Sequence, residues 1–247
     1  MSTQKRQTRA YRMKRRAELE EQTRRRITES AVALHQEIGP ARTSISAIAE
    51  HAGVRRSTVY RHFPDEETLF AVCSSHYRAA NPAPDPRPWT AITDPATRTE
   101  TALRELYAFY GRTEAMYASL LRDEPIVPIL RRLLRDFHDY LRTIQHMLMA
   151  GRGLRGRAAQ RTRAAIGHAL ALTTWQSLTR EQELTNDDAV TLMTRLVDSA
   201  AFAPTDGALM KPSGRNQWQP VAKRVRAKTA KRSGSATPRN RQQRSEN

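Results

Sequence analysis

Residues 44–63 read SISAIAEHAGVRRSTVYRHF, and this stretch decides the fold of the first part of the chain. Ile45, Ile48 and Ala49 mark the inner face of one short helix. Gly53 then permits a tight turn, because glycine adopts positive φ without a steric cost. A second short helix follows, and its outer face is crowded with hydrogen-bond donors. Two short helices joined at a glycine turn predict a helix-turn-helix motif.

The outer face of this motif predicts a DNA-reading surface. Arginine can form two hydrogen bonds with guanine, and hydroxyl and ring donors can reach phosphates. The alternative is an ordinary helical hairpin with a polar outer face, but donor density and chain charge favour DNA. The residues expected to contact DNA are Ser44, Ser46, Arg55, Arg56, Ser57, Thr58, Tyr60, Arg61 and His62.

Residues 24–72 resemble the DNA-binding domain of the tetracycline-repressor (TetR/AcrR) family. One position departs from the family pattern, which usually has a phosphate-binding lysine at the start of the fourth helix. Glu66 occupies that place here, so the contact is expected to be lost or moved to Arg61 or the tails. The resemblance is carried in register by Ile27, Ala31, Leu34, Gly39, Thr43-Ser44, Ile48-Ala49, Gly53-Val54, Ser57-Thr58, Tyr60, His62-Phe63 and Leu69-Phe70.

The net charge of +17 is concentrated at the two ends of the chain. Residues 1–26 hold ten basic and three acidic residues, and residues 211–247 hold eleven basic residues and one acidic residue. Basic arms attract nucleic acid. Contact with an anionic membrane is the alternative, but no amphipathic anchor or lipidation site accompanies these segments. The tails are therefore expected to bind DNA without reading its sequence.

Several classes of protein are disfavoured by the sequence. The single cysteine, Cys73, excludes an internal disulfide and a multi-cysteine metal site. No apolar run approaches the length of a membrane span, and no secretion signal is present, so a cytoplasmic protein is expected. The GxGxxG match at 151–156 follows a predicted helix instead of a strand, which argues against a dinucleotide site. His138 and His146 lie beside arginines, which disfavours zinc. We expect no metal, no cofactor and no enzyme activity.

The pattern of apolar residues predicts an all-α fold of about nine helices, because no segment alternates with period two. Proline-rich residues 81–93 predict a boundary between two domains. The predicted organisation is a disordered basic arm at 1–14, a helix-turn-helix domain at 15–80, the linker at 81–93, a regulatory and dimerisation domain at 94–204, and a disordered basic tail at 205–247. Helices of the second domain are expected at about 95–111, 113–122, 126–150, 157–180 and 186–201.

The last two predicted helices have more apolar surface than one neighbour can cover. Residues 164–172 are apolar or small on every side, which indicates burial on more than one face. The resemblance implies that these helices form a four-helix dimer interface, while complete burial within one chain is the alternative. The expected interface residues are Ile166, Ala169, Leu170, Leu192 and Leu196.

Aromatic and sulfur-containing side chains gather between residues 107 and 149. The resemblance implies a cavity for a small organic effector among these helices, although plain core packing explains any single residue equally well. The residues expected to line the cavity are Tyr107, Tyr110, Met116, Tyr117, Phe137, His138, Met147 and Trp175.

The sequence thus predicts a DNA-binding transcriptional regulator. By resemblance it is a repressor that binds a near-palindromic double-stranded DNA operator as a homodimer and is released by a small organic effector. The alternative is an effector-independent, nucleoid-type DNA-binding protein that uses its basic tails. No membrane partner is expected.

Overall fold

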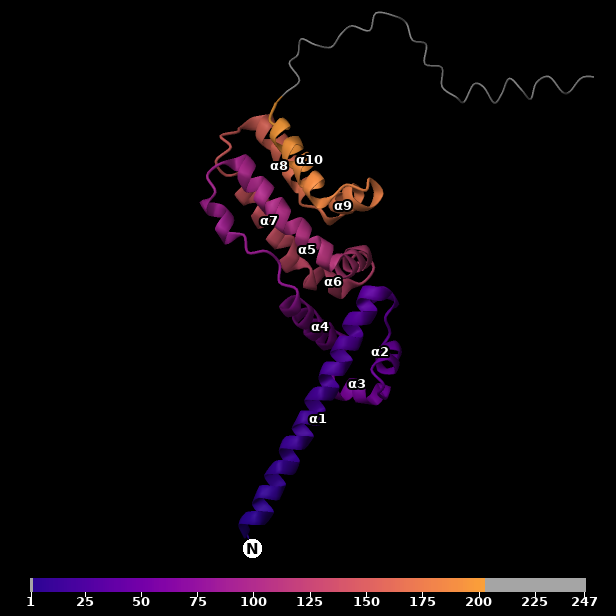
Figure 1. Ribbon diagram of the computed structural model, residues 1–247. Coiled ribbons are helices and arrows are strands. Elements are labelled where there is room, and N and C mark those ends of the chain that lie inside the picture. The colour runs from indigo at the N-terminus through magenta and orange to yellow at the C-terminus, as the bar shows by residue number, and fades with distance from the viewer. Residues whose placement is uncertain (1, 203–247) are drawn as a thin grey trace, which may run out of the picture. The chain divides into compact units, whose positions relative to one another are not determined.

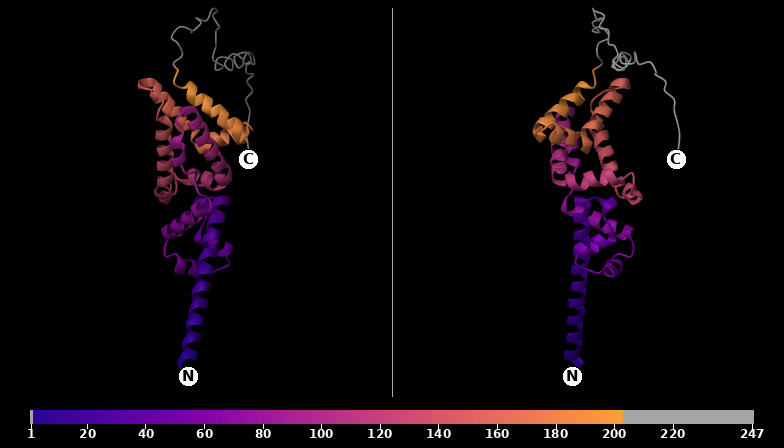
Figure 2. Two further views of the ribbon diagram at one scale, coloured as in Figure 1. Left: turned by 60° about the vertical axis from the view of Figure 1, so that its left-hand side comes forward. Right: turned by 90° about the vertical axis from the view of Figure 1, so that its right-hand side faces the viewer.

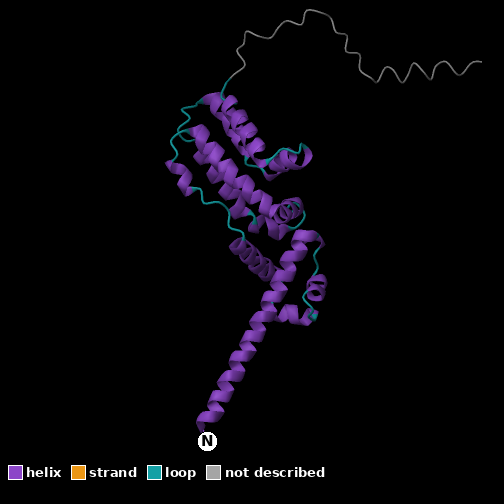
Figure 3. Cartoon of the chain, viewed as in Figure 1, coloured by secondary structure: helices purple, strands orange, loops and turns teal. Residues whose placement is uncertain are grey.

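The computed structural model describes residues 2–202, and all regular structure in this range is helical (Figure 1, Figure 3). The described residues contain no strand, which confirms the all-α prediction. Residues 2–202 hold ten α-helical segments, or nine if α8 and α9 are counted as one interrupted helix. The predicted basic tail at 205–247 lies outside the described residues.

Four helices form the N-terminal part, and three of them gather around the second half of the first (Figure 1, Figure 2). Gly53 makes the turn between the short helices with a φ of 61°. Ser44 caps one helix by accepting from Ala47 N at 3.1 Å, and Asp65 caps another by accepting from Thr68 N at 2.6 Å. The helix-turn-helix prediction is confirmed. The helices are α1 (Ser2–Glu37), α2 (Ile45–His51), α3 (Arg56–His62) and α4 (Glu66–Ala80), with a short 3₁₀ turn η1 (Pro40–Arg42) after α1.

Helix α1 begins at Ser2, although the sequence predicts a disordered arm over residues 1–14. No glycine or proline occurs before Gly39, and lysine, arginine, glutamine, alanine and methionine all favour the helix. These propensities explain why the helix extends beyond the part that packs. Residues 11–22 remain exposed along its length.

The proline-rich linker is more ordered than its sequence suggests. A 3₁₀ turn, η2 (Arg87–Ala91), lies inside it, because proline is tolerated in the first turn of a helix, where its missing N–H leaves no bond unmade. Trp89 in this turn is 1% exposed and belongs to the core of the second part. Arg98 donates from Nε to Ile92 O at 2.8 Å and from Nη1 to Ala150 O at 2.8 Å, which fixes the end of the linker to the second part.

The C-terminal part packs around one long helix, α5, which contacts α1, α7, α9 and α10. Residues 95–123 form this single helix where the sequence predicts two, because Gly111 keeps helical geometry and does not end it. The predicted helix at 126–150 is divided at Leu134. The elements are α5 (Pro95–Asp123), α6 (Pro128–Leu133), α7 (Arg135–Met149), α8 (Gly156–Ala169), α9 (Leu172–Gln176), a π turn η3 (Ser177–Glu181) and α10 (Asn186–Ser199).

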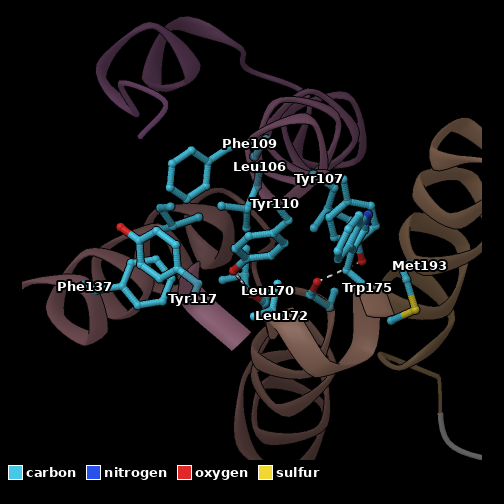
Figure 4. Packing of buried hydrophobic residues seen from close by; sticks show 14 of the residues in the cluster. Leu106, Tyr107, Phe109, Tyr110, Tyr117, Phe137, Leu170, Leu172, Trp175 and Met193 are labelled. Carbon is cyan, nitrogen blue, oxygen red and sulfur yellow. Dashed lines mark hydrogen bonds between the residues drawn. The ribbon is translucent and has the colours of Figure 1, made fainter. Parts of the chain in front are cut away.

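The predicted helix at 157–180 is interrupted at Ala171, whose backbone is extended. Tyrosines of α5 satisfy two carbonyls at this interruption, since Tyr107 Oη donates to Ala169 O at 2.9 Å and Tyr110 Oη donates to Leu170 O at 2.6 Å. Figure 4 shows both tyrosines inside the packed cluster, next to Trp175. The two tyrosine hydroxyls therefore stabilise the interruption. In an uninterrupted helix these carbonyls would accept from the helix backbone, and the buried hydroxyls would lose their partners.

The N-terminal and C-terminal parts are joined by hydrogen bonds from the last turns of α5 to the end of α1 and the turn after it. Ser119 Oγ donates to His35 O at 2.7 Å, and Ala41 N donates to Asp123 Oδ2 at 2.9 Å. Burial alone would raise the pKa of Asp123, but hydrogen bonds from Arg122 and Ala41 hold it below its ordinary value. A side chain at Gly39 would collide with Arg122 and Asp123, so glycine permits this close approach.

Replacing Tyr110 with phenylalanine tests the interruption after α8. The variant leaves the Leu170 carbonyl without its donor, so the free energy of unfolding should fall by about 1–3 kcal/mol in urea denaturation. Tyr11→Phe is the matched control, because Tyr11 is 65% exposed and its loss of a hydroxyl should change nothing measurable. Equal stability of the two variants would contradict this account.

Candidate nucleic-acid interface

Helix α3 presents a row of donors outward while its apolar side chains fix it to the domain. Val59 is 0% and Phe63 1% exposed, and both belong to the core shared by α1, α2 and α4. The opposite face carries Arg56, Tyr60 and Arg61, all exposed. This alternation leaves the polar face of α3 free for a groove of DNA.

Arg56 and Tyr60, one turn apart on α3, hold each other in place. Arg56 Nη2 donates to Tyr60 Oη at 3.1 Å, and its guanidinium lies 5.5 Å from the centre of the Tyr60 ring. Such i,i+4 and cation–π contacts favour one side-chain arrangement on an exposed helix. The two side chains are therefore partly preorganised on the exposed face of α3.

Arg24 of α1 fixes the end of α3, a role that no sequence pattern indicated. Its Nη1 donates to His62 O at 2.8 Å, and its guanidinium lies 4.6 Å from the centre of the Phe63 ring. A cation that binds a carbonyl at the last turn stabilises the carboxyl end of a helix. An arginine among many in α1 carries no sequence signal that would distinguish this role.

The nine predicted DNA-contacting residues lie together on α2, α3 and the residues preceding them, but they are not equally accessible. Thr58 and His62 are partly buried, and the other seven are exposed. His62 Nε2 is buried and has no hydrogen-bond partner among the described residues. Burial, and then Arg61 and Arg24, lower the pKa of His62, so its neutral form is favoured. The Ser44 hydroxyl accepts from Ala47 N and can still donate to a phosphate.

The start of α4 is acidic, as the sequence indicates. Glu66 is exposed at this end, and Glu67 pairs with Arg132 at 2.9 Å. The hydrogen bonds that Asp65 accepts from Thr68 lower the pKa of its carboxyl group. Three carboxylates at the start of α4 repel a phosphate. No lysine stands there to bind the phosphate, so a phosphate contact in this region would depend on Arg61.

A cavity of about 210 Å³ lies where α1 and α4 meet α5, α6 and α7. Of the predicted lining residues, Met116, Tyr117 and Phe137 line it. The other five predicted residues do not line this cavity, because their side chains have other environments. Tyr107, Tyr110 and Trp175 are buried in the core, His138 Nε2 lies 3.1 Å from Glu124 Oε1, and Met147 is partly buried against the core.

Seven of the seventeen residues that line the cavity come from the helix-turn-helix domain, and no sequence pattern pointed to their part in a cavity. His35 on α1 stacks on Phe70 of α4, with ring centres 4.8 Å apart, and both rings line the cavity with Tyr77. Burial lowers the pKa of His35 to about 4, against the opposing effect of Asp123. Burial also raises the pKa of Cys73 and of Tyr77 to about 12 in each case. At neutral pH these lining groups therefore carry no charge.

The predicted dimer residues divide into two sets. Ile166, Ala169 and Leu170 are at most 2% exposed within the single chain, so they offer little surface to a partner, and their place in an interface stays a prediction. Helix α8 packs against α7 and α10, which cover its apolar side. Leu192 and Leu196 of α10 are 39% and 48% exposed and remain available to a partner.

The other sequence motifs have structural explanations within residues 2–202. Gly151 and Gly153 in the loop between α7 and α8, and Gly156 at the start of α8, all have positive φ, as the prediction of a glycine-rich helix connection requires. The described residues contain no group of three or more histidine, cysteine or acidic side chains that could hold a metal ion. None of the described helices is long and apolar enough to cross a membrane.

Comparisons with known proteins identify the N-terminal domain. Residues 27–73 match the family described as bacterial regulatory proteins, tetR family. A TetR-like transcriptional regulator from Rhodococcus sp. RHA1 has a TM-score of 0.52 and 17% identity, over 72% of this chain and 94% of that chain. A protein from Syntrophomonas wolfei described as a TetR-family transcriptional regulator has a TM-score of 0.51 and 15% identity, over 76% and 98%. No curated protein sequence matches the chain. Residues 27–73 are therefore a helix-turn-helix domain of the tetR type. The two solved structures share the fold of the chain over the aligned residues.

Arg56→Ala tests whether α3 reads bases. Its affinity for a selected binding site should fall by about 1–3 kcal/mol, and preference at one base pair in each half-site should relax. Arg112→Ala is the matched control, because Arg112 is an exposed arginine of α5, away from α3. Unchanged affinity and sequence preference in Arg56→Ala would remove α3 as the reading helix.

Proposed function

We propose that this protein is a transcriptional repressor that binds a near-palindromic operator as a homodimer and is released by a small organic effector. The single observation that carries the proposal is α3, whose exposed arginines and hydroxyls are held outward by a buried core and by Arg24. Its place within a tetR-type domain supports DNA as the partner. Such a protein acts in the cytoplasm and needs no cofactor or catalytic activity.

The dimer is supported by the apolar surface of α10. Leu192 and Leu196 lie one turn apart on this helix, and both are exposed in the single chain. Large aliphatic side chains at this spacing form one stripe, which a second copy covers under two-fold symmetry. Helix α8 packs beside α10 (Figure 1), but its large apolar side chains are buried in the single chain, so the stripe on α10 carries the proposed interface.

Release by an effector is supported by the position of the cavity. Its wall includes α4 and the end of α1, while α5 holds the turn that leads into α2 through Asp123. A ligand that fits only one arrangement of these helices shifts the population toward it by its difference in affinity for the two states. We propose that this arrangement places the two α3 helices at the wrong spacing for the operator.

A second candidate is a nucleoid-type protein that binds DNA regardless of sequence. The exposed residues 11–16 of α1 favour it, because four of these six residues are arginine or lysine, none is acidic, and the stretch is exposed. Contacts of this kind are limited to phosphates and depend steeply on salt.

Selection of fragmented genomic DNA with the purified full-length protein separates the two candidates. The repressor proposal expects a few bound sites that share a near-palindrome, with half-sites one helical turn or a multiple apart. Recovery of DNA without a common sequence, with binding lost steeply as salt rises, would support the nucleoid-type candidate and overturn operator recognition.

Leu196→Glu tests the dimer. A carboxylate placed in an apolar interface loses its hydration without gaining a partner, so the variant should be a folded monomer and bind the selected operator much more weakly. Thr191→Glu is the matched control, because Thr191 is exposed on α10 but lies about 100° around the helix from Leu192. Sedimentation should show a dimer for the wild type and the control at micromolar concentration. A wild-type monomer would contradict the proposal.

A further inference from the structure

Aromatic rings dominate the cavity between the helix-turn-helix domain and the C-terminal part. His35, Phe70 and Tyr77 come from α1 and α4, and Tyr117, Phe137 and Tyr140 come from α5 and α7. The Tyr117 and Phe137 ring centres are 4.5 Å apart, and Phe137 and Tyr140 are 6.4 Å apart. Rings supplied from both sides favour a flat aromatic occupant, which gains offset-stacked and edge contacts.

One polar group of this cavity lacks a partner. Tyr77 lines the cavity and is 8% exposed, and its hydroxyl has no hydrogen-bond partner among the described residues. Tyr140, by contrast, donates to Pro84 O at 2.9 Å. Buried hydroxyls in native proteins almost always have a partner, so the unpartnered Tyr77 hydroxyl indicates that a ligand supplies an acceptor.

The charges around the cavity leave no place for an ionised ligand. Arg78 and Asp136 are the charged side chains of its lining, and they pair with each other at 3.4 Å. They are also 50% and 79% exposed, so water screens them. A carboxylate or ammonium group inside would lose its hydration without finding an unpaired partner.

The size of the cavity limits the ligand to a single ring. An apolar cavity of about 150 Å³ holds benzene. A cavity of about 210 Å³ therefore has room for one ring and a short substituent. Larger effectors would need the walls to move apart.

We propose that the effector of this protein is a small, neutral, monocyclic aromatic molecule with one hydrogen-bond acceptor, which binds between α1, α4, α5 and α7 and accepts from the Tyr77 hydroxyl. The inference rests on the proposed effector release and names the chemical class of the effector. Because seven of the seventeen lining residues belong to the helix-turn-helix domain, the ligand contacts α4 directly.

Three probes of nearly equal size test the proposal on full-length protein without DNA: acetophenone, cumene and benzoate. Acetophenone has a ring and a carbonyl acceptor, cumene has the same branched skeleton of nine heavy atoms without an acceptor, and benzoate is charged. Calorimetry on the wild type should give acetophenone about fivefold to tenfold tighter binding than cumene, the effect of one net hydrogen bond, and no detectable benzoate binding.

Tyr77→Phe keeps the ring and removes the donor, so the ratio of acetophenone to cumene affinity should fall to about one. Tyr140→Phe is the matched control and should keep the wild-type ratio, because its hydroxyl is already bound to Pro84 O. Leu120→Trp is a second test that does not depend on Tyr77. Leu120 lines the cavity, so a larger side chain there should fill it and abolish binding of both acetophenone and cumene.

Three results would overturn the inference: equal affinity of the wild type for acetophenone and cumene, an unchanged ratio in Tyr77→Phe, or binding of benzoate as tight as that of acetophenone. Absence of binding by every probe would also overturn it. The calorimetry is carried out without DNA, so its outcome is independent of operator binding. If the protein selects an operator but binds no probe, only the proposed class of effector is contradicted. A protein that binds acetophenone through Tyr77 but selects no operator contradicts the proposed function alone.

Discussion

The hydrogen bond from Ala41 N to the buried carboxylate of Asp123 is the contact on which the arrangement of the two parts depends. It joins the last turn of α5 to the turn between α1 and α2, and the bond from Ser119 to His35 O lies one turn earlier. A buried carboxylate is stable only when its oxygens are fully bonded, and Arg122 completes the set. The close approach also requires glycine at position 39. The end of α1 and the turn into α2 are therefore anchored to the core of the C-terminal part.

Helix α1 transmits this constraint because it contacts both ends of the system. Its carboxyl end accepts from Ser119, its middle fixes the end of α3 through Arg24, and its His35 forms part of the cavity wall. A rigid helix with these three contacts can couple an occupied cavity to the orientation of α3 without a large movement. Coupling of this kind requires two discrete arrangements that a ligand distinguishes by affinity.

Local signals made the helix-turn-helix predictable, whereas the cavity depends on contacts between distant segments. Ser44, Gly53 and Asp65 each act within a few residues, as two caps and a turn, so the sequence alone places α2, α3 and α4. The cavity is lined by residues of both α1 and α7, and the spacing of apolar residues within each helix does not indicate that the two helices meet. The apolar surface of α8 predicted an interface, but the same pattern is also what complete burial in one chain requires. Leu170 shows this ambiguity, since it is 2% exposed without a partner chain.

Amide hydrogen exchange on full-length wild type and Asp123→Ala tests the central claim most directly. If the carboxylate anchors the turn into α2, the variant should exchange faster at residues 39–52, while α8 and α10 keep their wild-type protection. Glu100→Ala, which removes an exposed partner of Arg104, is the matched control and should leave the pattern unchanged. Wild-type protection of residues 39–52 in Asp123→Ala would contradict the account.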